Sequence, residues 1–444
     1  MNNTADKFIF KNYNADFKSG FVEFFYNFER NKKTYEFKEI LRFKSAEVKN
    51  ESDFEIILKS LHLALGVSYW KTFCPKIIET PNISLTKSQA EFWNTVYTKG
   101  LGEFFFRNNI DFRGLVSFPY DENATSTPVS LPRKNRSLVG IGGGKDSIVT
   151  AELLKASGKD FSGFEMGSHP IRKSIIDILG VDFISIEREI DPEVLEINKM
   201  EDAYNGHVPI SMIYAFVALF GAALYDYRYI IVSNEKSSNY GNVEYLGEMV
   251  NHQWSKSYEF ELLFKNYVFE NVTPDIVYFS FLRPFYEFKI TELFSKYPKY
   301  FNSFSSCNTN FGIKNQTDAS LWCGKCAKCA FVFSMLSAFI PKNEMIKIFN
   351  NNLFAEASLL PLYSELLGIK DFKPFDCVGT PEEVKLAFYH SHLKGEYEKD
   401  SVMEMFVSKV LPQISGISEL EERLAHKDHD VNIPEEFKSV LNQI

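Results

Sequence analysis

The sequence predicts an α/β protein whose main element is a parallel β-sheet wrapped by helices. Short apolar segments alternate with helical segments in the middle of the chain, strand-like alternation occurs near the N-terminus, and the C-terminal part is mostly helical. The pattern of the middle region is the main evidence for a parallel sheet, because strands and helices that alternate along a chain are typical of parallel sheets.

The alternating segments of the middle region are short and well separated. A longer apolar run at residues 210–225 falls short of the ~20 residues that a bilayer-spanning helix needs, so we interpret it as a buried helix and expect no membrane insertion. Residues 137–300 are therefore expected to form one domain. Its strands are expected at residues 137–141, 161–165, 183–186 and 229–233, and its shorter helices at residues 148–156 and 171–179.

The first part of the chain has a different pattern. Residues 8–43 alternate apolar and polar side chains, which predicts antiparallel strands. Helical spacing follows at residues 54–65 and 88–106, so residues 1–130 are expected to form an N-terminal α+β domain. A stretch at residues 123–136 is rich in Pro, Ser and Thr and poor in apolar side chains, which indicates a linker before the next domain.

The last part of the chain contains a cysteine-rich segment and then helices. Residues 301–345 are expected to form a metal-binding knuckle followed by an apolar helix, and residues 346–444 a helical C-terminal region. A chain of 444 residues is too long for one ordinary core, so two or three packed units are expected.

Composition and charge exclude several classes of protein. The formal net charge of −9 argues against a large nucleic-acid interface, which normally requires an excess of Lys and Arg. The N-terminus lacks the basic start and apolar core of a secretory signal, so the protein is expected to be cytoplasmic. No feature of the sequence predicts an oligomeric state.

A glycine-rich segment follows the first strand of the middle region: Gly142-Gly143-Gly144-Lys145-Asp146-Ser147. Glycines let backbone N–H groups turn toward a polyphosphate, and the helix expected after them directs its positive N-terminus at the same anion. Lys145 adds a full positive charge and Ser147 a hydroxyl donor, so both are expected to face phosphates and to be needed for catalysis. The alternative is an ordinary glycine-rich turn between a strand and a helix.

The segment differs from two common nucleotide motifs. A Walker A motif would have Gly in place of Val139 and Ser or Thr in place of Asp146, and a dinucleotide fingerprint would have Gly in place of Lys145. It instead resembles the Ser-Gly-Gly-Lys-Asp-Ser motif of the PP-loop ATP pyrophosphatases, with Gly142 in place of the first Ser. The resemblance implies a PP-loop domain that cleaves ATP to AMP and pyrophosphate with Mg²⁺ as counter-ion. The change at Gly142 removes one hydroxyl contact with the phosphates.

Four of the six cysteines lie close together in the sequence: Cys307, Cys323, Cys326 and Cys329. Four thiolates and no histidine suit a structural zinc ion, and the same spacing can hold an iron–sulfur cluster or consist of unligated thiols. A similar arrangement in PP-loop synthases of deazapurine nucleobases favours Zn²⁺. Its expected role is to fix the edges of domains rather than to carry out chemistry.

Two polar segments follow the fourth expected strand. Because ligands in open α/β sheets bind at the carboxyl ends of strands, Asn234 and Glu235 are expected to contact ATP, unless they belong to a solvated loop. His252 and Lys256 lie four residues apart and would share a helix face, where they would supply a proton carrier and a cation. Either residue taken alone is more typical of a protein surface.

Cys377 is the one thiol outside the cysteine cluster with polar neighbours. It lies in Phe375-Asp376-Cys377-Val378-Gly379, where the glycine allows close approach of the backbone. A thiol with an ordinary pKa of ~8.5 can act as a base or as an acid near neutrality. Cys377 is therefore a candidate catalytic residue, the alternative being a thiol packed in the core.

Seven stretches carry a family resemblance: the glycine-rich segment Gly142–Ser147, named the phosphate loop below, the Cys323 to Cys329 triple, and residues 61–71, 100–108, 233–239, 251–257 and 375–383. Together they resemble the MurL family, the UDP-N-acetyl-α-D-muramoyl-L-alanyl-L-glutamate epimerases. This resemblance implies ATP-dependent inversion of the terminal L-Glu of UDP-MurNAc-L-Ala-L-Glu through an acyl-adenylate, in the synthesis of peptidoglycan precursors.

Two other functions are compatible with these motifs. A PP-loop enzyme that adenylates a tRNA base or a deazapurine would share the phosphate loop and the cysteines, although the negative net charge gives a tRNA substrate little support. A zinc-organised nucleotide-binding protein would bind ATP without turnover. Pyrophosphate release with and without the muramoyl dipeptide substrate distinguishes the three.

Overall fold

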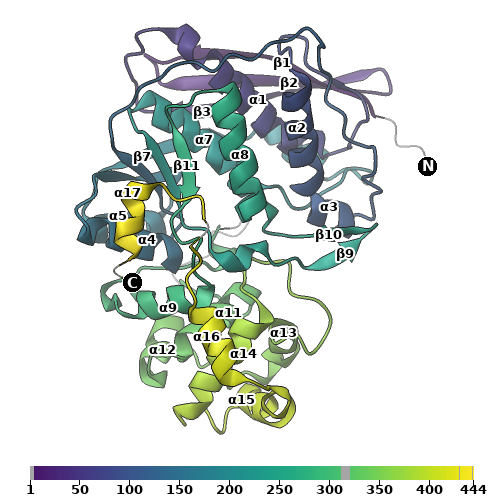
Figure 1. The fold of residues 1–444 in the computed structure, drawn as a ribbon. Coiled ribbons are helices and arrows are strands. Elements are labelled where there is room, and N and C mark those ends of the chain that lie inside the picture. Colours follow the sequence, from purple (N-terminus) through teal and green to yellow (C-terminus); the bar gives the residue numbers. More distant parts are fainter. Residues whose placement is uncertain (1–4, 312–320, 430, 443) are drawn as a thin grey trace.

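A nine-stranded sheet forms the centre of the part of the chain that the computed structural model describes, namely residues 5–311, 321–429, 431–442 and 444 (Figure 1). The strands lie in the order β11, β8, β5, β6, β7, β3, β2, β1 and β4. In chain order they are β1 (Ala5–Asp16), β2 (Phe21–Arg30), β3 (Lys33–Phe43), β4 (Ile78–Glu79), β5 (Ser137–Gly140), β6 (Phe161–Met166), β7 (Phe183–Glu189), β8 (Tyr229–Val232) and β11 (Val277–Ser280).

The five strands from β11 to β7 are parallel to one another. The chain starts this half at its central strand, β5, moves outward through β6 and β7, and then crosses to β8 and β11 on the other side. The strand order therefore reverses between β5 and β8, and in sheets of this kind ligands bind in the crevice outside the carboxyl ends of the strands at that point. The predicted alternation of parallel strands and helices is confirmed.

The N-terminal strands belong to the same sheet. Strand β3 pairs antiparallel with β7, for example at Phe43 and Ile186, and β2 and β1 continue the sheet as an antiparallel meander. The predicted antiparallel strands are confirmed, and they extend the parallel sheet rather than form a sheet of their own. The division of the chain into domains stays a prediction.

Two hydrophobic cores cover the two faces of the parallel half of the sheet, because side chains alternate between faces along each strand, and the first core extends over one face of the antiparallel half. On β5, Leu138 packs into one core and Val139 into the other. The first core contains α1 (Glu55–Trp70), α2 (Lys87–Lys99), α7 (Ile210–Leu224) and α8 (Tyr258–Asn271). The second contains α4 (Lys145–Ala156), α5 (Pro170–Leu179), α9 (Glu287–Ser295) and α11 (Ala327–Ser337).

The apolar run expected to be a buried helix is α7, in which most side chains are buried in the first core. No helix in the described part of the chain is long and apolar enough to cross a membrane. The single helix expected at residues 88–106 is divided, because α2 ends at Lys99 and α3 (Gly102–Arg107) begins after Gly100 and Leu101. A side chain at residue 100 would lie 3.1 Å from the Pro209 ring, so glycine there lets the two segments approach each other.

The C-terminal part is helical, as predicted, and lies at the end of the molecule opposite β1 and β2 (Figure 1). Its α-helices are α12 (Lys342–Phe349), α13 (Leu360–Leu366), α14 (Pro381–Leu393), α15 (Ser401–Met405), α16 (Ile417–Ala425) and α17 (Glu435–Leu441). Helix α17 returns to the sheet, where the Phe437 ring lies 5.0 Å from the rings of both Tyr229 and Phe279.

Helix α1 approaches the antiparallel half of the sheet most closely at Gly66. A Cβ atom at this position would fall on the Phe10 ring and lie 3.1 Å from Tyr26 Cε1. We therefore expect Gly66→Val to lower the free energy of unfolding by about 1–3 kcal/mol, as overpacked cores do. Urea denaturation measures this change, with Lys59→Ala on the half-exposed side of α1 as a control expected to change it by less than about 0.5 kcal/mol. An unchanged midpoint for Gly66→Val would contradict the packing described here.

Candidate functional site

The glycine-rich segment connects β5 to α4 at the point where the strand order reverses. Gly143 has a φ of +97°, a left-handed conformation that favours glycine, and a Cβ atom there would lie 2.9 Å from Phe311 Cζ. The Gly143 carbonyl accepts a hydrogen bond of 2.9 Å from the Ser305 amide. The loop is thus held in a shape that leaves the N-terminus of α4, with its positive partial charge, open toward the edge of the sheet.

Lys145, the first residue of α4, is buried and contacts two carboxylates, those of Asp146 and Glu287. Oxygens of Asp146, Glu235 and Glu287 lie within 4.8 Å of one another. Burial and the neighbouring Asp146 carboxylate raise the pKa of Glu287 to about 7. Three carboxylates around one lysine leave an excess of negative charge, and oxygen ligands of this kind suit a divalent cation such as Mg²⁺. We name this group the carboxylate cluster.

The other residues predicted to bind the nucleotide lie around this cluster. The Ser147 hydroxyl donates a hydrogen bond of 3.0 Å to the Gly144 carbonyl, which stabilises the first turn of α4. Glu235 and Asn234 follow directly after β8; the first joins the carboxylate cluster, and the backbone carbonyl of the second accepts a hydrogen bond of 2.5 Å from the Ser280 hydroxyl. The structure thus places Glu235 beside Asp146 of the phosphate loop. The contact described for Asn234 is made by its backbone to β11, and a contact of its side chain with ATP stays a prediction.

A second polar group surrounds Cys377, which lies in the connection between α13 and α14. The Lys256 ammonium donates a hydrogen bond of 3.3 Å to the Cys377 sulfur, and the charge of His252 also acts on this thiol. Lys328 Nζ donates to the backbone carbonyl of Cys377. Burial alone would raise the pKa of the thiol, but the charges of Lys256 and His252 outweigh it and hold the pKa well below its ordinary value. These cations therefore favour the thiolate form of Cys377.

His252 and Lys256 reach Cys377 by a route that differs from the prediction. They do not share the face of an α-helix, because His252 precedes a short 3₁₀ helix, η3 (Trp254–Lys256), which ends at Lys256. The Asn251 side chain accepts a hydrogen bond of 2.8 Å from the Gln253 amide and replaces the bond of a helical turn. The prediction of a common helix was wrong, whereas both side chains do face one thiol.

Lys256 also links this group to the carboxylate cluster. The negative charges of Cys377 and Glu235 outweigh its burial and raise its pKa above the ordinary value, so its ammonium group stays protonated. Burial raises the pKa of Glu235 above its ordinary value, and the same cation offsets part of this rise. The phosphate loop and the thiolate are therefore parts of one continuous polar site.

Several residues of the site were not singled out from the sequence. The buried carboxylate of Glu103 on α3 contacts His252 Nδ1, and it lies 3.2 Å from His207 Nδ1. Glu287 of the carboxylate cluster and Lys328, which contacts the Cys377 carbonyl, were also not singled out from the sequence. A carboxylate within an apolar segment such as Gly102-Glu103-Phe104-Phe105 is the one local signal that could have indicated Glu103, because an isolated charge on a buried helix requires a partner.

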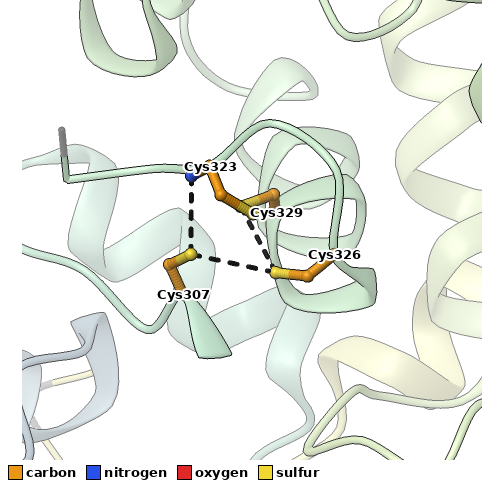
Figure 2. Close-up of side chains that lie close together, drawn as sticks. All are labelled: Cys307, Cys323, Cys326 and Cys329. Atoms are coloured by element: carbon orange, nitrogen blue, oxygen red, sulfur yellow. Dashed lines mark hydrogen bonds between the residues drawn. The ribbon is translucent and has the colours of Figure 1, made fainter. Parts of the chain in front are cut away.

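The four predicted cysteines lie together in space (Figure 2). Their sulfur atoms are separated by 3.9 Å between Cys307 and Cys326, 3.7 Å between Cys323 and Cys329, and 3.5 Å between Cys326 and Cys329. A zinc ion bound by four thiolates at ~2.3 Å would place them ~3.8 Å apart in a regular tetrahedron. The cluster therefore has the ligands and the size for one metal ion.

Residues next to the cysteines in the sequence contact both the phosphate loop and the Cys377 segment. Ser305, two residues before Cys307, holds the Gly143 carbonyl of the phosphate loop. Lys328, directly before Cys329, holds the Cys377 carbonyl. A metal ion that joins Cys307 to Cys329 would thus fix the phosphate loop relative to the thiolate.

The fold and site together define an α/β protein with a glycine-rich loop, a carboxylate cluster and a thiol beside two cationic side chains at the carboxyl edge of a parallel sheet. Residues 1–281 match the family model of the MurL N-terminal domain and residues 303–420 that of the MurL C-terminal domain. The chain belongs to the MurL family.

Three relatives carry the name UDP-N-acetyl-alpha-D-muramoyl-L-alanyl-L-glutamate epimerase. The protein of Xanthomonas oryzae pv. oryzae is 36% identical over 82% of this chain and 81% of its own length. The protein of a Micromonospora species is 32% identical over 86% of each chain. The protein of Salinispora tropica is 34% identical over 74% of this chain and 72% of its own.

We expect the purified protein to contain about one zinc ion per chain and to be colourless, because four thiolates around a d¹⁰ ion give no visible absorption. Elemental analysis measures the metal content. Cys326→Ser should lose most of the zinc, whereas Cys377→Ser should retain it because this thiol lies outside the cluster. A brown sample that contains iron would refute the assignment of zinc.

Proposed function

We propose that the protein is an ATP-dependent epimerase that inverts the terminal L-Glu of UDP-MurNAc-L-Ala-L-Glu to D-Glu through an acyl-adenylate. The names of the three relatives support the reaction and the substrate. The observation that carries the proposal is the continuity of the site: Lys256 lies between a thiolate suited to proton transfer and a phosphate loop suited to the cleavage of ATP.

Activation of the carboxylate solves the chemical problem of the reaction. The α-proton of a terminal glutamate is hard to remove while the adjacent carboxylate is ionised, because its loss would place a second negative charge beside the first. Transfer of AMP to the carboxylate removes that charge and makes the carbonyl electron-withdrawing. A side-chain base can then take the α-proton.

The phosphate loop supplies the groups for adenylation. The N–H groups of Gly142 to Gly144, the start of α4 and the Lys145 ammonium are arranged to hold the pyrophosphate that leaves as the carboxylate attacks the α-phosphorus. The donor set of Asp146, Glu235 and Glu287 suits Mg²⁺, which would offset phosphate charge when bound. In this proposal the ammonium of Lys145, which contacts two of these carboxylates, turns toward the phosphates as ATP enters.

Proton transfer at Cα uses the thiolate and the imidazolium. The Cys377 thiolate takes the α-proton and becomes a thiol, and the His252 imidazolium gives a proton to the opposite face of the planar carbon. After the product has left, the Cys377 thiol gives its proton to the neutral His252 imidazole, which restores the starting charges. Lys256 remains protonated and stabilises the negative charge that develops on the substrate. Water finally cleaves the acyl-adenylate to release the D-glutamyl product and AMP.

The first test is pyrophosphate release with and without UDP-MurNAc-L-Ala-L-Glu, with chiral analysis of the glutamate after acid hydrolysis. The proposal requires release that depends on this substrate and is accompanied by D-Glu. Release that instead requires a tRNA or a deazapurine carboxylate would support a different PP-loop enzyme, and ATP binding without release would support a binding protein.

Lys145→Met tests the phosphate loop. We expect formation of AMP and pyrophosphate to fall about 100-fold or more, because a full charge at the leaving group is lost. Circular dichroism verifies folding, since removing one partner of a buried ion pair also destabilises the protein. Lys155→Met at the other end of α4 is the matched control and should retain activity. A folded Lys145→Met protein with normal turnover would exclude this loop from catalysis.

Cys377→Ser tests the proton-transfer role, because a hydroxyl group is a far weaker acid than a thiol. We expect exchange of the glutamate α-hydrogen with D₂O to fall about 100-fold or more, while AMP formation continues. The two measurements on one variant separate adenylation from epimerisation. If exchange stays at the wild-type rate, Cys377 is not the base.

A further inference from the structure

Both oxygens of the Glu103 carboxylate have partners within the site. One oxygen contacts His252 Nδ1 and lies 3.2 Å from His207 Nδ1, and the other accepts a hydrogen bond of 2.7 Å from Arg107 Nε. The side chain of Glu103 is 7% exposed, whereas that of Arg107 is 53% exposed. The arrangement places a buried carboxylate beside the histidine whose charge lowers the pKa of the Cys377 thiol.

We propose that Glu103 is a positioning residue that completes a Glu103–His252–Cys377 relay. Its carboxylate binds Nδ1 of His252, which fixes the ring plane and leaves Nε2 as the nitrogen directed at the thiol. This relay deepens the proposed epimerase function, because it assigns the group that keeps the proton donor in place. Glu103 acts through His252 and does not itself touch the reacting carbon.

The charge balance within the relay supports this assignment. His252 and His207 share one carboxylate, and their rings lie 4.7 Å apart, so protonation of both would place two like charges side by side. Burial and the neighbouring His252 charge lower the pKa of His207 to about 3, so His207 is neutral and can only donate an N–H to Glu103. Burial would likewise lower the pKa of His252, but Cys377 and Glu103 outweigh it and raise this pKa to about 9. The single proton therefore resides on the histidine that faces the thiol.

Other charged groups also surround Cys377, and they limit how much Glu103 can change the pKa of the thiol. Lys256 contacts the sulfur directly, so loss of the relay weakens the thiolate without abolishing it. The charged groups near the thiol and the two histidines are Lys71, Glu103, Arg107, Lys256, Lys328, Lys373 and Asp376.

The rate of Cys377 alkylation by iodoacetamide as a function of pH tests the relay, with the modified cysteine identified by peptide mass analysis. The assay needs neither ATP nor substrate, so its result is independent of whether the epimerase reaction is correct. In the wild type we expect a midpoint well below that of an ordinary thiol. Glu103→Gln should raise the midpoint by about one pH unit, and lower the rate below the midpoint about tenfold, because the imidazolium loses its counter-charge. Glu103→Asp keeps a carboxylate, so its midpoint should lie between those of the wild type and Glu103→Gln.

The matched control is Glu39→Gln. Glu39 is also buried and pairs with an arginine, Arg188, at 2.6 Å, but it lies on β3 in the antiparallel half of the sheet. This variant should keep the wild-type alkylation profile. The relay is refuted if Glu103→Gln keeps the wild-type midpoint, or if Glu39→Gln raises it equally.

A second measurement covers the case in which Glu103→Gln does not fold. Histidine NMR of the wild-type protein should show one imidazole that stays protonated well above the ordinary histidine range, with a downfield N–H proton bonded to a carboxylate. Both signals should disappear in His252→Gln and persist in His390→Gln, a variant of a partly exposed histidine on α14. An ordinary titration midpoint for His252 would overturn the proposal.

Discussion

The ammonium group of Lys256 neutralises two anionic centres that would otherwise repel each other across the site. On one side it donates to the Cys377 sulfur at 3.3 Å, and on the other it attracts Glu235 of the carboxylate cluster. Burial of an isolated thiolate or carboxylate costs several kcal/mol, so a shared cation favours the ionised form of both centres. The loops after β5 and β8 and the connection before α14 therefore depend on one another electrostatically, although they are far apart in the sequence.

The sheet brings these loops together, and its extension explains the role of the N-terminal part. Strand β3 pairs with β7, and this antiparallel half carries α1, α2 and α3 along the same face as α7. Helix α3 thereby reaches the edge of the parallel half and presents Glu103 to His252. The N-terminal strands thus affect the site by fixing the position of α3. Pairing of β3 with β7 joins the two halves of the sheet and so fixes α3 relative to His252.

Motifs whose residues are adjacent in the sequence could be predicted, and contacts between distant segments could not. The phosphate loop and the cysteine triple have local patterns, because a phosphate or a metal ion needs several ligands from one turn of chain. Glu103 and Glu287 each look ordinary in the sequence and acquire a role only when the sheet brings their segments together. The predicted helix at His252 and Lys256 was wrong for a related reason: spacing of four residues indicates a helix, but Asn251 offers its own side chain to the backbone and replaces the helical turn.

A metal ion held by the cysteine cluster would influence the site without touching the substrate. Cys307 and Cys329 are the ligands nearest to the two residues that hold the site together, since Ser305 supports Gly143 and Lys328 supports the Cys377 carbonyl. Loss of a metal would release both supports at once, and the distance between the phosphate loop and the thiolate would no longer be set. In the proposed reaction, adenylation and proton transfer act on neighbouring atoms of one glutamate, so they require that distance to be fixed. The position of the cluster between the two halves of the site is therefore better explained by alignment of the two reactions than by stability alone.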